Sequence, residues 1–152
     1  MNQLEAKSRL VNELRNIIAP GYSGTQSELC ELLKDKGLQA NQSSISRALS
    51  KLGVVKFQLD GVSRYELKND LSSVLSSKGS LAKFVLSISS NEANIVVSTT
   101  PGSAMFVAAF IDQNCKGDIL GAVAGDDTIL IAPRSCKMIK KHLAAISTII
   151  LN

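Results

Sequence analysis

The chain has 152 residues, 45% of them hydrophobic, with 17 Lys and Arg against 13 Asp and Glu and a net charge of +4. No apolar run is long enough to cross a membrane and the first residues do not resemble a signal peptide, so we expect a soluble, cytoplasmic protein with no membrane partner. Three scattered cysteines favour a reducing compartment, and a single His leaves too few ligands for zinc, which predicts no metal site.

The first half of the chain begins with two predicted helices. Residues 2–18 place aliphatic side chains on one face, and a Pro-Gly pair at 20–21 ends this first helix. Thr25 followed three residues later by Glu28 is the pattern of a capping box, which marks the start of a second helix. Gly37 can adopt the left-handed conformation that ends such a helix. The second helix is therefore expected between Thr25 and Gly37.

A third helix follows almost at once and is capped by Asn41 or Ser43. Its apolar stripe is expected to consist of Ile45, Leu49 and Leu52. Its small, polar and cationic face is expected to consist of Ser44, Arg47, Ala48 and Lys51. No acidic residue occurs between Lys36 and Leu59, so this face can approach a phosphate backbone without like-charge repulsion. Two helices joined by a tight turn predict a helix-turn-helix, although domains that bind no DNA contain them too.

A strand hairpin after the third helix strengthens the DNA-binding interpretation. Val55, Phe57 and Leu59 alternate with polar side chains up to Asp60-Gly61, a favoured two-residue hairpin turn, and Tyr65 and Leu67 follow on the other side. A hairpin directly behind a recognition-type helix is a wing. Lys56 and Arg64 lie on its two strands, where they could reach phosphate.

The polar, Ser-rich stretch that follows has the composition of a linker. We predict a winged-helix DNA-binding domain at residues 1–68, a linker at 69–80 and an oligomerisation domain at 81–152. Each domain is small enough that its core is marginal, which favours oligomerisation.

The second half reads as strand, strand, helix, strand, strand, helix, which predicts an α+β fold, an antiparallel α/β sandwich with helices on one face. The expected elements are strands at 81–89 and 94–98, a helix at 103–112, a hairpin across 118–133 and a helix at 136–151. In the first strand Ala82, Phe84, Leu86 and Ile88 are expected to face the core. The sheet surface that the helices leave uncovered favours self-association.

Both helices of this half have expected buried positions. The first is almost entirely apolar, starts with Pro101 near its first turn and is closed by Asp112. In the last helix the inward side chains are expected to be Met138, Leu143, Ile146 and Ile149 or Ile150.

Asp126 and Asp127 lie between two apolar runs, and an exposed hairpin tip explains such a pair by default. Alternatively, the pair faces a subunit boundary and receives a guanidinium and an ammonium group, as a cationic amino acid carries. A divalent metal is a weaker alternative, because two carboxylates without a third ligand make a poor cage. A small-molecule enzyme on an α+β sandwich is a further alternative, since fold does not fix function. We do not expect an enzyme, because a single His and no nucleophile beside a base cannot supply proton transfer.

Two motifs resemble the bacterial arginine repressor family: NQSSISRALSKLG at 41–53 and GAVAGDDTILIAP at 121–133, supported by TTPGSA at 99–104. The resemblance covers essentially the whole chain. It implies a winged helix, a trimerising C-terminal domain and two trimers stacked into a hexamer. It also implies L-arginine bound between the trimers as a co-repressor ligand, with no other cofactor, and repression of arginine biosynthesis genes from palindromic operators.

Carried over by position, the family's DNA-reading residues fall on Ser43, Ser44 and Arg47. With the cations derived above, the expected DNA-binding set is Ser43, Ser44, Arg47, Lys51, Lys56 and Arg64. The ligand carboxylates fall on Asp126 and Asp127, and Asp112 matches a further acid near the pocket. The expected ligand-binding set is Asp126, Asp127, Met105, Asp112, Ala124 and Thr128.

Met105 departs from the family pattern, which usually offers a polar side chain such as Gln or His to the ligand at this position. A thioether accepts hydrogen bonds only weakly. The resemblance therefore leaves a second interpretation open, a family member whose effector response is altered or lost.

Overall fold

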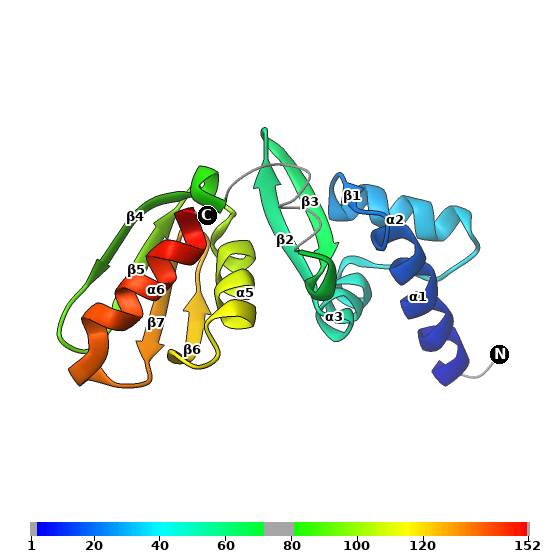
Figure 1. The fold of residues 1–152 in the computed structure, drawn as a ribbon. Helices are drawn as coiled ribbons and strands as arrows, with labels where there is room; N and C mark the ends of the chain where they lie inside the picture. Colours follow the sequence, from blue (N-terminus) through cyan, green and yellow to red (C-terminus); the bar gives the residue numbers. More distant parts are fainter. Residues whose placement is uncertain (1–2, 72–80, 152) are drawn as a thin grey trace. The chain divides into compact units, whose positions relative to one another are not determined.

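The computed structural model describes residues 3–71 and 81–151. They form two compact units, residues 1–69 and 70–152, and each is described by itself (Figure 1). Lys68–Asp70 form a short 3₁₀ helix, η1. Most of the predicted linker, residues 72–80, lies outside the described residues.

The first unit contains three helices and a three-stranded antiparallel sheet of order β1-β3-β2. Its elements are α1 (Gln3–Ile18), β1 (Tyr22–Ser23), α2 (Gln26–Asp35), α3 (Gln42–Leu52), β2 (Val54–Leu59) and β3 (Val62–Leu67). The core joins the inner faces of the three helices to Tyr65 of the sheet. This is the predicted winged helix-turn-helix, with β1 as an additional short strand that the sequence did not indicate.

Local hydrogen bonds explain where these helices begin and end. The Thr25 amide donates to Glu28 Oε2 at 2.6 Å and the Glu28 amide donates to Thr25 Oγ1 at 3.2 Å, which completes the predicted capping box. Asn41, rather than Ser43, caps α3. Gly53 ends α3 in the left-handed conformation, with φ of 66°. Ala48 does not lie on the polar face of α3 as expected but is buried in the core.

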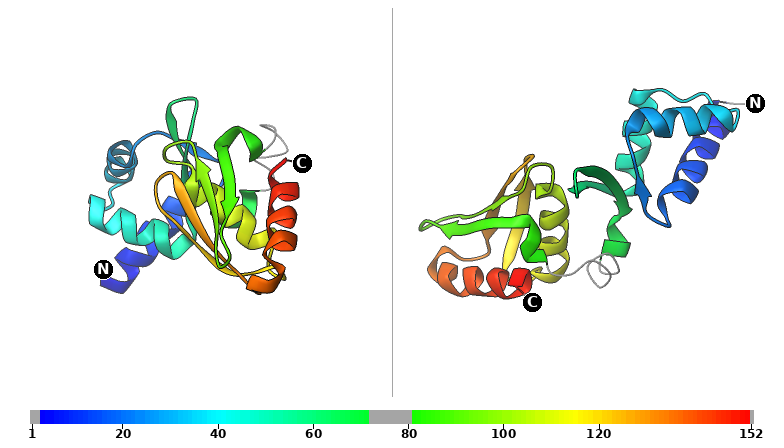
Figure 2. Two further views of the ribbon diagram at one scale, coloured as in Figure 1. Left: turned by 90° about the vertical axis from the view of Figure 1, so that its left-hand side faces the viewer. Right: turned by 90° about the horizontal axis from the view of Figure 1, so that it is seen from above.

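The second unit is a four-stranded antiparallel sheet of order β4-β5-β7-β6 with two helices packed on one face (Figure 2). Its strands are β4 (Val85–Ser90), β5 (Ile95–Thr99), β6 (Ile119–Ala124) and β7 (Thr128–Pro133), and its helices are α5 (Ala104–Asn114) and α6 (Ile139–Leu151). The helices cover the sheet face formed by Ile95, Val97, Ile129 and Ile131, all fully buried. The predicted α+β order is confirmed.

The first predicted strand of this unit was wrong at its start. Leu81–Phe84 form a 3₁₀ helix, η2, and the strand begins only at Val85. The pairing register with β5 shifts between Val85 and Ser87. Such a bulge adds one residue to the strand. Leu86, the residue within the bulge, is 69% exposed instead of buried, whereas Ile88 pairs with the buried Val97 and keeps the face expected for it.

The two helices also differ in detail from expectation. Pro101 lies in the turn just before α5, near its first turn as expected, and the helix continues two residues beyond Asp112. A 3₁₀ turn, η3 (Cys136–Met138), precedes α6, and it leaves Met138 exposed rather than inward. The buried stripe of α6 is His142, Ile146 and Ile150, spaced four residues apart.

Candidate nucleic-acid interface and acidic site

The outward face of α3 carries exposed cations. Ser43, Arg47 and Lys51 are exposed, while Ile45 and Leu49 on the opposite side fix the helix to the core. The sequence did not single out Ser46 and Ser50, which are exposed as well. This face is therefore small, polar and positively charged, which suits a helix that enters the major groove of DNA.

Ser44 has a different role from the other predicted readers. Its hydroxyl donates to the Asn41 carbonyl at 2.8 Å and accepts from the Asn41 amide at 3.0 Å, while its own amide donates to Asn41 Oδ1 at 2.8 Å. It occupies the position where a capping box usually has Glu or Gln. The hydroxyl is thus engaged in starting α3, and the spacing of Asn41 and Ser44 could have indicated this.

The two predicted wing cations have different environments. Lys56 is exposed, and its Nζ lies 6.0 Å from the ring centroid of Tyr65, its cross-strand neighbour. Arg64 is paired through one guanidinium nitrogen with Glu66 Oε1 at 3.3 Å, and its side chain is only 22% exposed. A Cβ on Gly21 would lie 2.7 Å from that same carboxylate oxygen. Glycine at position 21 thus leaves room for the pair, and only Lys56 presents its charge freely to solvent.

The fold brings the TTPGSA and GDD motifs together, although they lie more than twenty residues apart in sequence. The Thr99 amide donates to the Asp127 carbonyl at 2.7 Å and the Ala104 amide donates to the Asp126 carbonyl at 3.3 Å. The Gly102 amide donates to the Asp126 carboxylate at 3.2 Å. The loop carrying the acid pair is therefore fixed to the turn that precedes α5.

Both carboxylates remain exposed on the single chain. Asp127 accepts one hydrogen bond from the Thr128 hydroxyl at 2.9 Å, and Ala124 ends the strand that leads into the loop. Met105, 51% exposed, directly follows the Ala104 amide that contacts the loop. The fold thus places Met105, Ala124, Asp126, Asp127 and Thr128 around one loop.

Asp112 lies further from this loop along the chain, on the same face of α5 as Met105 but seven residues on, which is about 10 Å along a helix axis. Its charge acts on a neighbouring thiol. Burial, followed by the charges of Asp118 and Asp112, raises the pKa of Cys115 to about 11. Cys115 is therefore an inert core thiol at neutral pH.

The sheet face opposite the helices carries a row of apolar side chains that is uncovered on one chain. Val123 of β6 pairs with Leu130 of β7, and Leu130 pairs with Val96 of β5, so the three side chains form a row across the sheet. Val123 is 73% exposed. An exposed apolar face of this kind is typical of a protein–protein interface.

Within residues 3–71 and 81–151, no three Cys, His, Asp or Glu side chains are grouped as a metal ion would require. None of the described helices is long and apolar enough to cross a membrane.

Comparison with known proteins identifies relatives for both units. The family described as "Arginine repressor, DNA binding domain" matches residues 6–73, and "Arginine repressor, C-terminal domain" matches residues 81–148. The arginine repressor of Pasteurella multocida is 39% identical over 85% of this chain and 84% of its own. The arginine repressor of Colwellia psychrerythraea is 35% identical over 94% of this chain and 92% of its own. The arginine repressor of Carboxydothermus hydrogenoformans is 39% identical over 91% of this chain and 95% of its own.

Proposed function

The chain belongs to the arginine repressor family of DNA-binding transcriptional regulators, and on this basis we propose that it represses arginine biosynthesis genes when L-arginine is bound. It acts in the cytoplasm as a hexamer, a dimer of trimers, on palindromic operators. Residues 69–80 connect its DNA-binding domain to its oligomerisation domain.

In this proposal α3 enters the major groove. Arg47 is the chief base reader, because a guanidinium can bind O6 and N7 of guanine together. Ser43 contacts bases or phosphate beside it, and Lys51 contacts phosphate. Lys56 on the wing reaches the backbone next to the groove. These side chains are exposed and positively charged or polar, which supports their assignment.

The observation that carries the arginine response is the acid pair held on the turn before α5 by three backbone donors. Asp126 and Asp127 receive the guanidinium and ammonium groups of arginine through charge-assisted hydrogen bonds. Both carboxylates are exposed on one chain, so a second copy of the protein completes the site. The apolar face of the sheet supports such self-association.

Met105 supports a second candidate, a regulator of this family with an altered effector. Its thioether is exposed beside the acid pair and offers a ligand only a weak acceptor. A ligand other than arginine, or arginine bound more weakly, would then control the same DNA-binding machinery.

Calorimetric titration with arginine, lysine, ornithine and citrulline tests the effector. Arginine binding in preference to citrulline is expected, because citrulline has the same shape without the guanidinium charge. Gel shifts on operator DNA with and without arginine then test the response. A parent protein that binds operator DNA but not arginine would favour the altered-effector candidate.

A further inference from the structure

The first helix contributes a cation to the edge of the recognition helix. Lys7 lies on α1, three residues before Leu10 and seven before Leu14, both of which are buried. This spacing puts Lys7 on the core-facing stripe of α1, one turn before the core begins. A lysine there faces α3 rather than open solvent on the far side of the helix.

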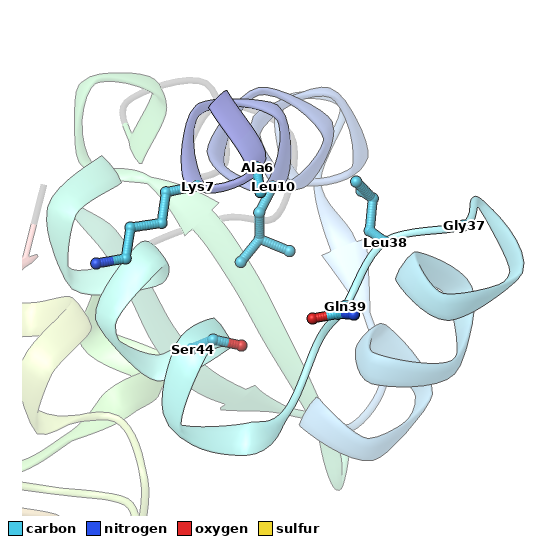
Figure 3. A pocket seen from close by; sticks show the side chains of 7 residues that line it. All are labelled: Ala6, Lys7, Leu10, Gly37, Leu38, Gln39 and Ser44. Atoms are coloured by element: carbon cyan, nitrogen blue, oxygen red, sulfur yellow. The ribbon is translucent and has the colours of Figure 1, made fainter. Parts of the chain in front are cut away.

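Two adjoining grooves between α1 and α3 show where Lys7 lies. One, of about 300 Å³, is lined by Lys7, Leu10, Val11, Ser44, Arg47, Ala48 and Lys51. The other, of about 530 Å³, is also lined by Lys7 and Ser44, and Figure 3 shows Lys7 extending from α1 alongside α3. Lys7 thus shares a groove with Arg47 and Lys51, two residues of the proposed DNA-binding face.

The charge of this surface favours phosphate. Among the described residues that line the two grooves, three are cationic and none is acidic. The remaining lining residues are uncharged: Ala6, Leu10, Val11, Gly37, Leu38, Gln39, Ser44 and Ala48. Like charges that no acidic residue among the described lining residues balances attract an anion from outside, and the anion next to a recognition helix is the DNA backbone.

We propose that Lys7 contacts a backbone phosphate of the DNA bound by α3, so that the DNA-binding surface extends onto α1. The inference rests on the proposed function. Lys7 contacts phosphate rather than a base edge, since it lies beside α3 and not on the exposed face that carries Ser43 and Arg47. It therefore adds affinity without sequence preference.

The test is the salt dependence of DNA binding by the full-length protein and its variants. Losing one phosphate contact lowers the slope of log affinity against log salt by about 0.9 for each DNA-binding domain engaged. Lys7→Ala should show this decrease on operator and random DNA alike. At 0.1 M salt the affinity should be roughly eightfold lower per engaged domain, because a slope difference of about 0.9 acts over the tenfold range of salt between 1 M and 0.1 M. Lys7→Arg should keep the parental slope.

Lys36→Ala is the matched control, because it removes one positive charge from the same unit. Lys36 is paired with Glu13 at 2.8 Å and lines neither groove. If it lowers the slope as much as Lys7→Ala, the effect is one of net charge and the proposal fails. If the parent binds operator DNA and Lys7→Ala keeps its slope, the proposal fails while the proposed function stands. If the parent binds no DNA at all, both fail.

Discussion

The two units of this protein present their functional residues in opposite ways. In the first, the cations of α3 and β2 project from elements that are fixed within one chain by capping boxes and a shared core. In the second, the acid pair is fixed just as firmly by backbone donors, yet its carboxylates and the apolar sheet face are left open. The first site is structurally complete on one chain, whereas in the proposed function the second requires another copy.

This difference separates the physical roles of the two sites. A complete cationic surface binds a polyanion whatever the assembly state, and its affinity depends on salt. In the proposed function the incomplete acidic site couples the ligand to assembly, because carboxylates and their symmetry copies would repel each other until a cation lies between them. Ligand should therefore raise the apparent stability of the larger assembly by mass action. The following substitutions test whether DNA binding by the first unit and ligand binding by the second can be changed independently.

The largest effect is expected from Asp127→Asn, which keeps the side-chain size and removes one charge. Arginine binding should weaken by at least about 2 kcal/mol, roughly thirtyfold in Kd, because a charged pair across an interface loses one member. The ligand-induced shift in assembly should vanish, while assembly without ligand should be at least as strong as in the parent. Calorimetric titration and sedimentation measure both, and DNA binding without ligand should not change.

Glu92→Gln is the control for this variant. It removes the same charge at an exposed position of the same unit, in the turn between β4 and β5. Parental arginine affinity in Asp127→Asn would remove the acid pair from the ligand site. A matching loss in Glu92→Gln would mean that net charge, not the position of Asp127, controls binding.

Arg47→Ala should have the next largest effect, confined to the first unit. Operator binding should weaken by about 1–3 kcal/mol and the preference for operator over random DNA should decrease, because a bidentate contact to guanine is lost. Arginine binding and assembly should be unchanged. Arg15→Ala, at an exposed position on α1, is the control. Gel shifts at fixed salt would show equal losses on both DNAs if Arg47 contacted phosphate alone.

The sequence predicted those parts of each unit that depend on neighbouring residues. Thr25 and Glu28 satisfy each other across three residues, and Asp60 and Gly61 both take positive φ in their turn, so the pattern alone placed the second helix and the hairpin. The approach of the 99–104 turn to the acid pair depends on the register of β5 with β7, which is non-local. Only the family resemblance indicated it.

The alternation of apolar and polar residues along a strand did not predict the environment of every side chain. Leu86 lies within the bulge of β4 and is exposed instead of buried, and no residue type marks a bulge there. For Arg64 the contact with DNA stays a prediction, and pairing with Glu66 or Asp60 was the alternative; in the structure Glu66 is buried beside it and pairs with it. Burial of an acid on the same strand face cannot be read from alternation.

Lys56→Ala and Arg64→Ala test whether the two wing cations differ in role, one binding DNA and the other stabilising the fold. Lys56→Ala should lower the salt slope of DNA binding by about 0.9 per engaged domain and leave the thermal midpoint unchanged. Arg64→Ala should instead lower the free energy of unfolding by about 1 kcal/mol, because it leaves the buried Glu66 carboxylate without its cation. Salt titration and thermal unfolding of both variants separate the two effects. A lower slope in Arg64→Ala at parental stability would restore Arg64 to the DNA surface.

The smallest effect is expected from Met105→Gln, which tests how complete the ligand site is on α5. An amide can hydrogen-bond to a bound guanidinium or carboxylate where a thioether cannot, so arginine binding should tighten by about 0.5–1.5 kcal/mol, roughly two- to tenfold in Kd. Met138→Gln is the control, because Met138 is an exposed methionine of the same unit outside the site.

Titration calorimetry of the parent and both variants separates the two candidate functions. Tighter arginine binding in Met105→Gln, but not in Met138→Gln, would place the side chain at position 105 at the ligand. It would also mean that methionine at this position lowers the affinity of the site for arginine. If the parent binds no arginine and Met105→Gln gains it, the effector of this chain has changed through that residue. If all three proteins bind arginine equally, Met105 does not face the ligand. In that case α5 contributes no side chain to the site at position 105, and the second copy of the chain completes the site.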